Sequence, residues 1–252
     1  MLPKHGRLDC TRCFGEKSCD FDKTAETSGD WRIVNNPLAW GNQKAEIAVL
    51  GFSKGPNQRG ALATKSVDEV AFERGRTPLA KILHHIRLIE RPDRDLVDSS
   101  IEDVNSRFHF GSLVRCSVER YDTSTGEWTG TGAGMLDRFV KKEFGHRVVG
   151  NCIEQHLGNL PMETKLVILL GMGSKGNYIR SCKEAFRNAL GGNWEQHNEV
   201  AYSDGNRMFV HTEHFKSQGA LLPNWLSESQ HERGRLGLLA REAVAASGVV
   251  TV

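Results

Sequence analysis

Two short apolar runs, each ending directly in glycine, constrain the fold of this chain most. Residues 47–50 lead into Gly51, and residues 166–170 lead into Gly171. An apolar run without polar alternation is typical of a strand buried on both faces, as in parallel sheets. Such a strand delivers its C-terminal end to a crevice where the following loop carries binding residues. We therefore expect the loop after residue 50 to form part of a site.

Helical patterns alternate with further apolar runs along the chain. We expect strands at residues 31–34, 108–118 and 209–211, and helices at residues 77–89, 136–144, 152–160 and 225–246, with a further helix that follows residues 166–173 and ends near residue 190. This alternation predicts a parallel sheet with helices on both faces. With 252 residues, 38% of them hydrophobic, the chain is long enough for one sizeable core. We predict a single α/β domain over residues 1–252, a three-layer α/β/α sandwich around a mainly parallel four-stranded sheet.

Two segments fall outside this pattern. Residues 1–30 carry cysteines and many charges but few apolar residues, so this arm is expected to need a metal or the main body to order it. Residues 119–134 are rich in Thr, Gly and Ser and predict a long loop. No apolar run has the length of a membrane span and the first residues lack a signal peptide, so we expect a cytoplasmic protein without a membrane partner. A formal net charge of +2 leaves the partner open.

Six cysteines in a chain without an export signal indicate thiols or metal ligands rather than disulfides. Cys10 and Cys13 form a Cys-Thr-Arg-Cys pair, and Cys19 follows closely. The others are expected at a strand end, at the start of a helix and within a helix, at Cys116, Cys152 and Cys182 respectively.

Several common sites are not supported by the motifs. No Gly-x-Gly-x-x-Gly follows the first strand and no Gly-Lys-Ser/Thr loop is present, so we expect no nucleotide cofactor. Ser53 lies in Gly-Phe-Ser-Lys-Gly, which is not the serine motif of hydrolases. Loops that follow parallel strands meet at one edge of the sheet, so residues 51–58, 112–116, 171–175 and 211–216 should lie together.

These loops and cysteines occur in an order that resembles the uracil-DNA glycosylase superfamily, especially its iron–sulfur branch. The resemblance covers residues 8–225 and is carried by five pieces. They are Cys10-Thr11-Arg12-Cys13, Gly51-Phe52-Ser53-Lys54-Gly55, Leu113-Val114-Arg115-Cys116, Cys152-Ile153-Glu154-Gln155 with the later strand ending in Gly171, and Val210-His211. The usual His-Pro-Ser is replaced by His211-Thr212-Glu213.

The resemblance implies a structural metal centre. Cys10, Cys13, Cys116 and Cys152 stand where the family places the four ligands of a [4Fe–4S] cluster, which would tie the N-terminal arm to the sheet. Zinc on the same four thiolates, a local zinc knuckle that includes Cys19, and unligated thiols are the alternatives. The segment between Cys116 and Cys152 is longer than is usual in the family.

The resemblance also implies a monofunctional DNA glycosylase, which flips a base out of DNA and hydrolyses its N-glycosidic bond. His211 would donate a hydrogen bond to the departing base, and Asn57 or Glu213 would position water. The base would lie against Gly51, Phe52, Ser53, Lys54, Gly55 and Ser112, and would stack on Phe72. Phe52, Ser53 and Ser112 depart from the family's polar residues at these places, which favours a damaged or bulkier modified pyrimidine over plain uracil.

For contacts with DNA phosphates the preferred candidates are Lys175 and Lys216, because each follows a strand end. A second hypothesis is a binding module that recognises modified or abasic DNA without turnover. A third, a redox protein unrelated to DNA, depends on the cysteines alone.

Overall fold

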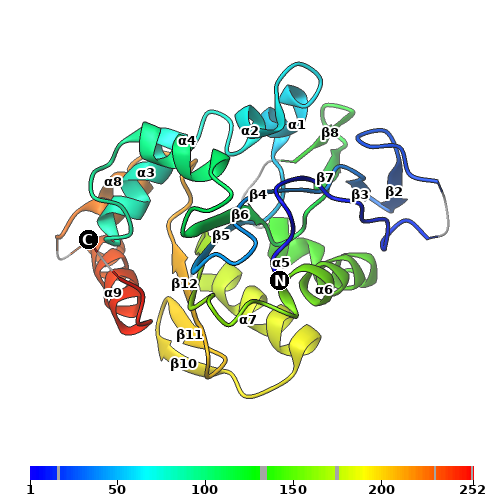
Figure 1. The fold of residues 1–252 in the computed structure, drawn as a ribbon. Helices are drawn as coiled ribbons and strands as arrows, with labels where there is room; N and C mark the ends of the chain where they lie inside the picture. Colours follow the sequence, from blue (N-terminus) through cyan, green and yellow to red (C-terminus); the bar gives the residue numbers. More distant parts are fainter. Residues whose placement is uncertain (16–17, 131–134, 174–175, 230, 251) are drawn as a thin grey trace.

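The computed structural model describes residues 1–252 except 16–17, 131–134, 174–175, 230 and 251, and leaves the side chains of residues 56, 57 and 135 undescribed. An eight-stranded mixed sheet forms its centre in the order β1-β4-β6-β5-β9-β12-β11-β10 (Figure 1). Its strands along that order are β1 (Gly6–Arg7), β4 (Leu38–Gly41), β6 (Phe108–Ser112), β5 (Ile47–Gly51), β9 (Leu166–Leu170), β12 (Met208–Thr212), β11 (Ala201–Ser203) and β10 (Glu195–Asn198).

The four middle strands, β6-β5-β9-β12, are parallel, whereas β4, β1, β11 and β10 extend the sheet antiparallel at both sides. The predicted α/β class is confirmed, but the prediction of a four-stranded sheet is wrong. The flanking strands are short and partly polar, as in Glu195–Asn198, so they lack the apolar runs by which the middle strands were recognised. Strands β5, β6 and β9 are buried at every position, as expected for strands covered on both faces.

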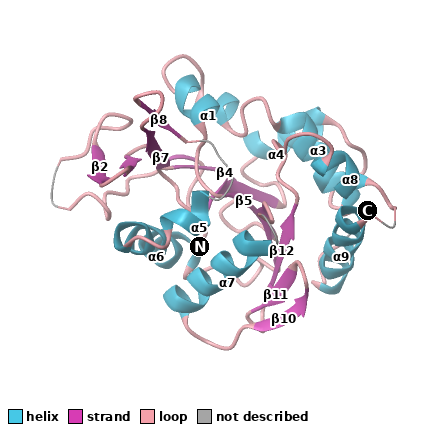
Figure 2. Cartoon of the chain, turned by 180° about the vertical axis from the view of Figure 1, so that it is seen from behind, coloured by secondary structure: helices cyan, strands magenta, loops and turns pink. Residues whose placement is uncertain are grey.

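Helices cover both faces of the sheet (Figure 2). One face carries α3 (Arg76–His85), α4 (Arg94–Glu102), α8 (Leu221–Leu226) and α9 (Glu232–Ala246), which contact one another. The other group packs together as α5 (Met135–Phe139), α6 (Glu143–Leu157) and α7 (Asn177–Leu190). Two short helices, α1 (Pro56–Ala61) and α2 (Val67–Val70), follow β5. Within the described part of the chain, none of the helices combines the length and the apolarity that crossing a lipid bilayer requires.

A second sheet joins two segments that were expected to be irregular. Its order is β2-β3-β7-β8, all antiparallel, and its strands are β2 (Ala25–Ser28), β3 (Trp31–Val34), β7 (Ser117–Asp122) and β8 (Glu127–Thr129). Residues 119–129 are thus a β-hairpin rather than a loop, and residues 131–134 lie outside the described residues. The predicted single strand at 108–118 is also wrong. It breaks at residues 113–116, where the chain leaves the central sheet for the second one.

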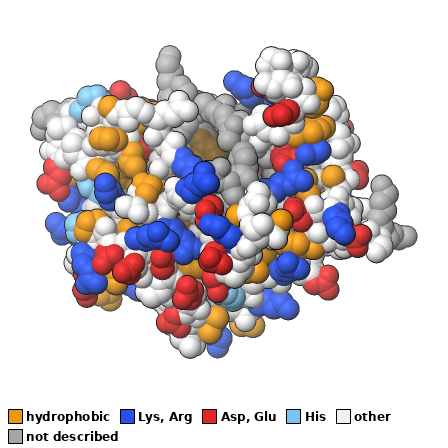
Figure 3. Space-filling view, turned by 90° about the horizontal axis from the view of Figure 1, so that it is seen from above, with side chains coloured by type: hydrophobic (Ala, Val, Ile, Leu, Met, Phe, Trp, Pro, Cys, Tyr) orange, Lys and Arg blue, Asp and Glu red, His pale blue; other side chains and the backbone are white. Residues whose placement is uncertain are grey.

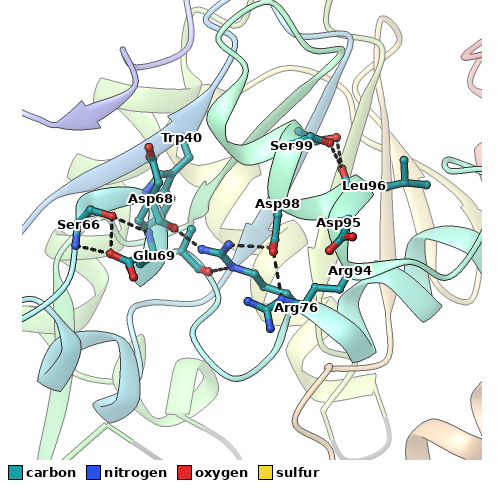
Figure 4. A network of polar contacts seen from close by, with 12 residues as sticks. Trp40, Ser66, Asp68, Glu69, Arg76, Arg94, Asp95, Leu96, Asp98 and Ser99 are labelled. Atoms are coloured by element: carbon teal, nitrogen blue, oxygen red, sulfur yellow. Dashed lines mark hydrogen bonds and ion pairs between the residues drawn. The ribbon is translucent and has the colours of Figure 1, made fainter.

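Arg76 fixes the connection from α2 to α4 (Figure 4). Its guanidinium contacts Asp98 at 2.8 Å, the Ala71 carbonyl at 2.8 Å and the Asp68 carbonyl, although only 9% of the residue is exposed. A buried guanidinium is stable only when its donors are satisfied, as they are here. The turn at residues 72–75, which lies between these contacts, is therefore held in place.

Candidate functional site

The loops that follow the parallel strands lie at one edge of the sheet, as predicted. Gly51 at the end of β5 is the register partner of Ser112 at the end of β6, and Thr212 of β12 pairs with Leu170 of β9. Figure 3 looks from above onto the molecule and shows lysine and arginine side chains near the centre of this face. The candidate site is this edge.

The glycine loop, Gly51 to Gly55, is hydrogen-bonded to the segment that follows β6 but leaves open space beside its glycines. The Gly51 and Phe52 carbonyls accept hydrogen bonds from the Leu113 and Val114 N–H groups at 2.8 and 2.9 Å. Among the described residues, no heavy atom lies within 4 Å of the place that a first side-chain carbon would take at Gly51 or Gly55. Ser53 is half-buried and Ser112 is buried at the adjacent strand end.

Two side chains of this loop turn away from the predicted base site. Phe52 packs its ring against Phe139 of α5, with 6.2 Å between ring centroids. Lys54 is 1% exposed, and its ammonium donates to the Arg115 carbonyl. Burial lowers the pKa of Lys54 to about 8, while Cys116 opposes that shift. Lys54 therefore faces the cysteines rather than a bound base, which corrects its prediction as a substrate contact.

His211 lies in the core, with both ring nitrogens engaged. Nδ1 is 2.9 Å from the Gly171 carbonyl and must donate to it, which leaves Nε2 to accept from the Tyr202 hydroxyl at 3.2 Å. The residue is 0% exposed, and burial lowers its pKa to about 4, so the imidazole is neutral near pH 7. In this arrangement neither nitrogen is available to donate to a base, contrary to the predicted role.

Glu213 is likewise occupied. Its carboxylate accepts from Arg233 at 2.9 Å, from the Ser217 hydroxyl at 2.6 Å and from the His214 N–H at 3.1 Å. The residue is 4% exposed. These contacts make Glu213 a buried ionic anchor of the loop after β12 rather than the free carboxylate that water positioning needs.

His214 is a candidate that sequence reasoning missed. Its Nδ1 accepts from the Lys216 N–H at 3.1 Å, so the proton of a neutral ring is on Nε2. Burial, followed by the charge of Lys216, lowers the pKa of His214 to about 4. Among the described residues Nε2 has no hydrogen-bond partner. The signal in the sequence was a second histidine in the same loop, next to an aromatic residue.

Phe72 has a packing role in addition to the predicted stacking role. It is 4% exposed and makes edge contacts with Phe110 of β6 and Phe215 of the loop after β12, at 5.8 and 5.6 Å. Its φ of 50° lies in the left-handed region, as does that of Arg74 at 56°. Gly75 admits the Phe215 ring, which any side chain there would overlap. The turn at 72–75 is therefore a tightly fitted aromatic bridge across the sheet edge.

Basic side chains lie along this bridge. Lys216 is exposed over part of its surface. The burial of the rest, together with nearby Arg74, lowers its pKa, and the charge of Glu73 opposes this shift. Lys65 contacts Glu73 at 2.8 Å, and Arg74 is 78% exposed at its side chain. Lys175 lies outside the described residues, and Asn57 lies in the first turn of α1 with its side chain undescribed.

The four cysteines of the predicted metal centre lie together. Every pair among them interacts electrostatically, although they come from the N-terminal arm, the break after β6 and helix α6, at Cys10, Cys13, Cys116 and Cys152. Burial raises the pKa of Cys116 to about 12 and that of Cys13 above its ordinary value, so these two thiols are protonated near pH 7 without a metal. Cys152 does not open a helix as predicted, because α6 begins nine residues earlier at Glu143. Cys182 packs in α7, where it contacts Tyr178.

The described residues include no group of three or more His, Cys, Asp or Glu side chains already placed to hold a metal ion. A cluster does not require such a group, because each thiolate binds a different iron. The donor set and its surroundings nevertheless fit an anionic centre. Asn151 donates to the Cys13 sulfur at 3.5 Å, and the charges of Arg147 and Arg12 lower the pKa of Cys13. Cys10, Cys13, Cys116 and Cys152 are therefore the residues that would hold a cluster.

Arg115 is buried beside these cysteines and lacks an acidic partner among the described residues. Its backbone N–H contacts the Cys152 thiol, and its guanidinium lies over Gly111, where any side chain would overlap it. Nη2 is 3.5 Å from His109, whereas Nε and Nη1 have no hydrogen-bond partner in the described structure. Burial lowers the pKa of Arg115 to about 10. Only 1% of Arg115 is exposed, so its guanidinium is not available to DNA phosphates.

Comparison with models of known protein families, and with curated proteins, gives no match for this chain.

Proposed function

We propose that this protein is a DNA glycosylase that extrudes a damaged or modified base and hydrolyses its N-glycosidic bond. The observation that carries the proposal is the convergence of Cys10, Cys13, Cys116 and Cys152. The motif order alone implied that these residues should meet, although Cys10 and Cys152 lie 142 positions apart along the chain. Four cysteines from three separate segments would not be expected to lie together beside a glycine loop unless they act together.

The chemistry requires stabilisation of a base that leaves with negative charge. A neutral imidazole with a free N–H can donate to the base carbonyl without introducing a proton that must later be removed. His214 meets this requirement through Nε2, whereas His211 would first have to give up Tyr202 or Gly171. We assign the donor role to His214 and treat His211 as a positioning residue for the ends of β9 and β12.

Water activation is assigned to Asn57, because Glu213 is already neutralised by Arg233. Asn57 follows Gly55 closely and lies at the start of α1, so it belongs to the same loop region as the proposed base site. An amide positions water by hydrogen bonding and does not take up its proton, which suits a leaving group that departs before water attacks.

The open space at Gly51 and Gly55, with the small Ser53 and Ser112 nearby, supports a substrate larger than uracil. A pocket without bulky side chains does not exclude a substituent on the base. We therefore propose a 5-substituted or otherwise modified pyrimidine as substrate. Lys216, Arg74 and Lys65 would contact phosphates, since phosphate contacts position DNA without reading its sequence. Lys175 stays a proposed phosphate contact.

The cysteine centre is proposed to hold a [4Fe–4S] cluster, with zinc as the alternative. Its role is structural, because it joins the arm to α6 and to the break after β6. When bound, the metal centre supplies cross-links that the sparse apolar side chains of the arm do not. Metal analysis of anaerobically purified protein distinguishes iron with sulfide from zinc.

The experiment is a single-turnover excision assay followed by alkali cleavage. Oligonucleotides carry uracil, 5-substituted uracils, oxidised pyrimidines or hypermodified pyrimidines, each as single and double strands. We expect cleavage at a modified base, and His214→Ala should reduce it by about 100-fold or more while DNA binding is kept. His197→Ala, on exposed strand β10, is the matched control. Loss of excision in His211→Asn with full activity in His214→Ala would reassign the donor.

A second candidate function is recognition of modified or abasic DNA without turnover. The observation that favours it is that His211 and Glu213, two of the three predicted catalytic residues, are engaged within the protein. In the same assay a pure binding protein would retard the oligonucleotides and leave every base in place.

A further inference from the structure

Two positive side chains are buried beside the four cysteines, and neither forms an ion pair with a carboxylate in the described part of the chain. Lys54 and Arg115 are each 1% exposed. The Asp22 carboxylate, which acts on Lys54 through its charge, already accepts from Asn36 at 2.8 Å and lies 3.5 Å from Arg59. Buried charges in proteins are paired, because an isolated ion loses its hydration without compensation. These two cations therefore need an anion that the thiols in their neutral form do not provide.

The contacts of both residues point to the cysteines as that anion. Cys116 and Cys152 lie close enough to Lys54 to interact with it, and Cys152 interacts with Arg115 as well. The chain also makes room for the arrangement, since Gly111 has no side chain where the Arg115 guanidinium lies. Nε and Nη1 of Arg115 are buried donors without an acceptor in the described structure.

Charge counting identifies the form that the cysteines take. Four thiolates around one zinc ion, or around a [4Fe–4S] core in its oxidised state, carry two net negative charges. The buried ammonium and guanidinium supply two positive charges against them, in addition to those of the exposed Arg12 and Arg147 beside Cys13. We propose that Lys54 and Arg115 are the fixed counter-charges of a dianionic metal–thiolate centre at Cys10, Cys13, Cys116 and Cys152.

The arrangement also connects the metal centre to the glycine loop. Lys54 belongs to that loop and donates to the carbonyl of Arg115, the residue before Cys116. Loss of the metal removes the anionic centre and leaves the Lys54 ammonium without its counter-charge. The glycine loop then loses its inward anchor, so the metal centre holds the proposed base site in shape. This inference rests on the metal centre of the proposed function but not on base excision.

The test is the effect of Lys54→Met and Arg115→Met on the protein with and without metal. In metal-loaded protein, each variant should release its metal to a chelator about 10- to 100-fold faster than the wild type. In metal-free protein, Lys54→Met should be at least as stable as the wild type, because it removes an uncompensated buried charge. Lys81→Met, an exposed lysine on α3, is the matched control and should change neither property.

Opposite effects in the two forms are not expected from a packing defect, which would destabilise both. Wild-type release rates in Lys54→Met and Arg115→Met would overturn the proposal, as would wild-type protein that binds neither iron nor zinc. If a variant does not fold without metal, the rate at which its metal-loaded form releases metal to the chelator still tests the proposal. Because no step measures base excision, failure here is distinguishable from failure of the glycosylase assay.

Discussion

The neutral buried state of His211 predicts a specific loss of stability in acid. Burial holds its pKa at about 4, compared with about 6.5 in the unfolded chain. Between these values the unfolded state binds the proton and the folded state does not, so stability falls as the pH falls. The loss begins below about pH 6.5 and is complete below about pH 4. One pKa unit corresponds to about 1.4 kcal/mol, so His211 accounts for about 3 kcal/mol of this loss.

The perturbation is His211→Asn, which keeps an N–H near the Gly171 carbonyl but cannot titrate. At neutral pH the variant should be less stable than the wild type, because the Tyr202 hydroxyl loses its acceptor. As the pH is lowered, the difference in the free energy of unfolding between the two proteins should shrink by about 3 kcal/mol, because only the wild type loses stability through protonation of this ring. Other buried histidines, such as His156, titrate in both proteins and cancel in the comparison.

The assay is urea denaturation of both proteins at several values between about pH 7.5 and pH 4, where the histidine contribution changes. Tyr202→Phe is the control: it loses the same hydrogen bond but keeps a buried imidazole, so it should still lose this share of stability on acidification, as the wild type does and His211→Asn does not. If His211→Asn and the wild type lose stability in parallel, His211 does not titrate as its burial requires, and the reasoning from its environment is refuted.

Three further outcomes are expected. Glu213→Gln should destabilise the protein by about 3 kcal/mol, because it leaves the Arg233 charge with a neutral partner in a half-buried pair. The measurement is urea denaturation, and an unchanged denaturation midpoint would show that the pair is solvated. Phe72→Ala should cost about 3 to 4 kcal/mol through lost packing on Phe110 and Phe215, whereas a base-stacking role alone would leave the midpoint unchanged and weaken only DNA binding. Removal of metal by a chelator should expose the arm at residues 1–30 to limited proteolysis, and an arm that resists cleavage equally with and without metal would contradict its dependence on the cysteine centre.

The sequence was sufficient where local pattern and burial agree. The runs at 47–50, 166–170 and 209–211 are strands, and α7 lies where the helix ending near Leu190 was expected, because each has a periodicity that only one kind of element satisfies. The convergence of the post-strand loops also followed from the sequence, since parallel strands place their C-terminal ends at one edge. The same reasoning missed β10 and β11, whose short and partly polar strands are stabilised by neighbours rather than by their own pattern.

The directions of side chains were decided by the tertiary structure alone. Lys54 was expected to face a base because it lies in the Gly51–Gly55 motif, yet its ammonium points inward and donates to the Arg115 carbonyl beside the cysteines. His211 was expected at the mouth because it ends a strand, but Tyr202, from a strand that was not foreseen, binds it in the core. His214 became a candidate only when its hydrogen bonds showed which nitrogen carries the proton.

The amino-acid sequence by itself determined the α/β class and the edge of the sheet at which a site can form. These depend on periodicity and chain order, which a sequence contains in full. Only the tertiary structure decided which polar groups are satisfied inside the protein and which are left free to bind. Hydrogen bonding and charge pairing are made between residues distant in the chain, and their partners cannot be read from local pattern.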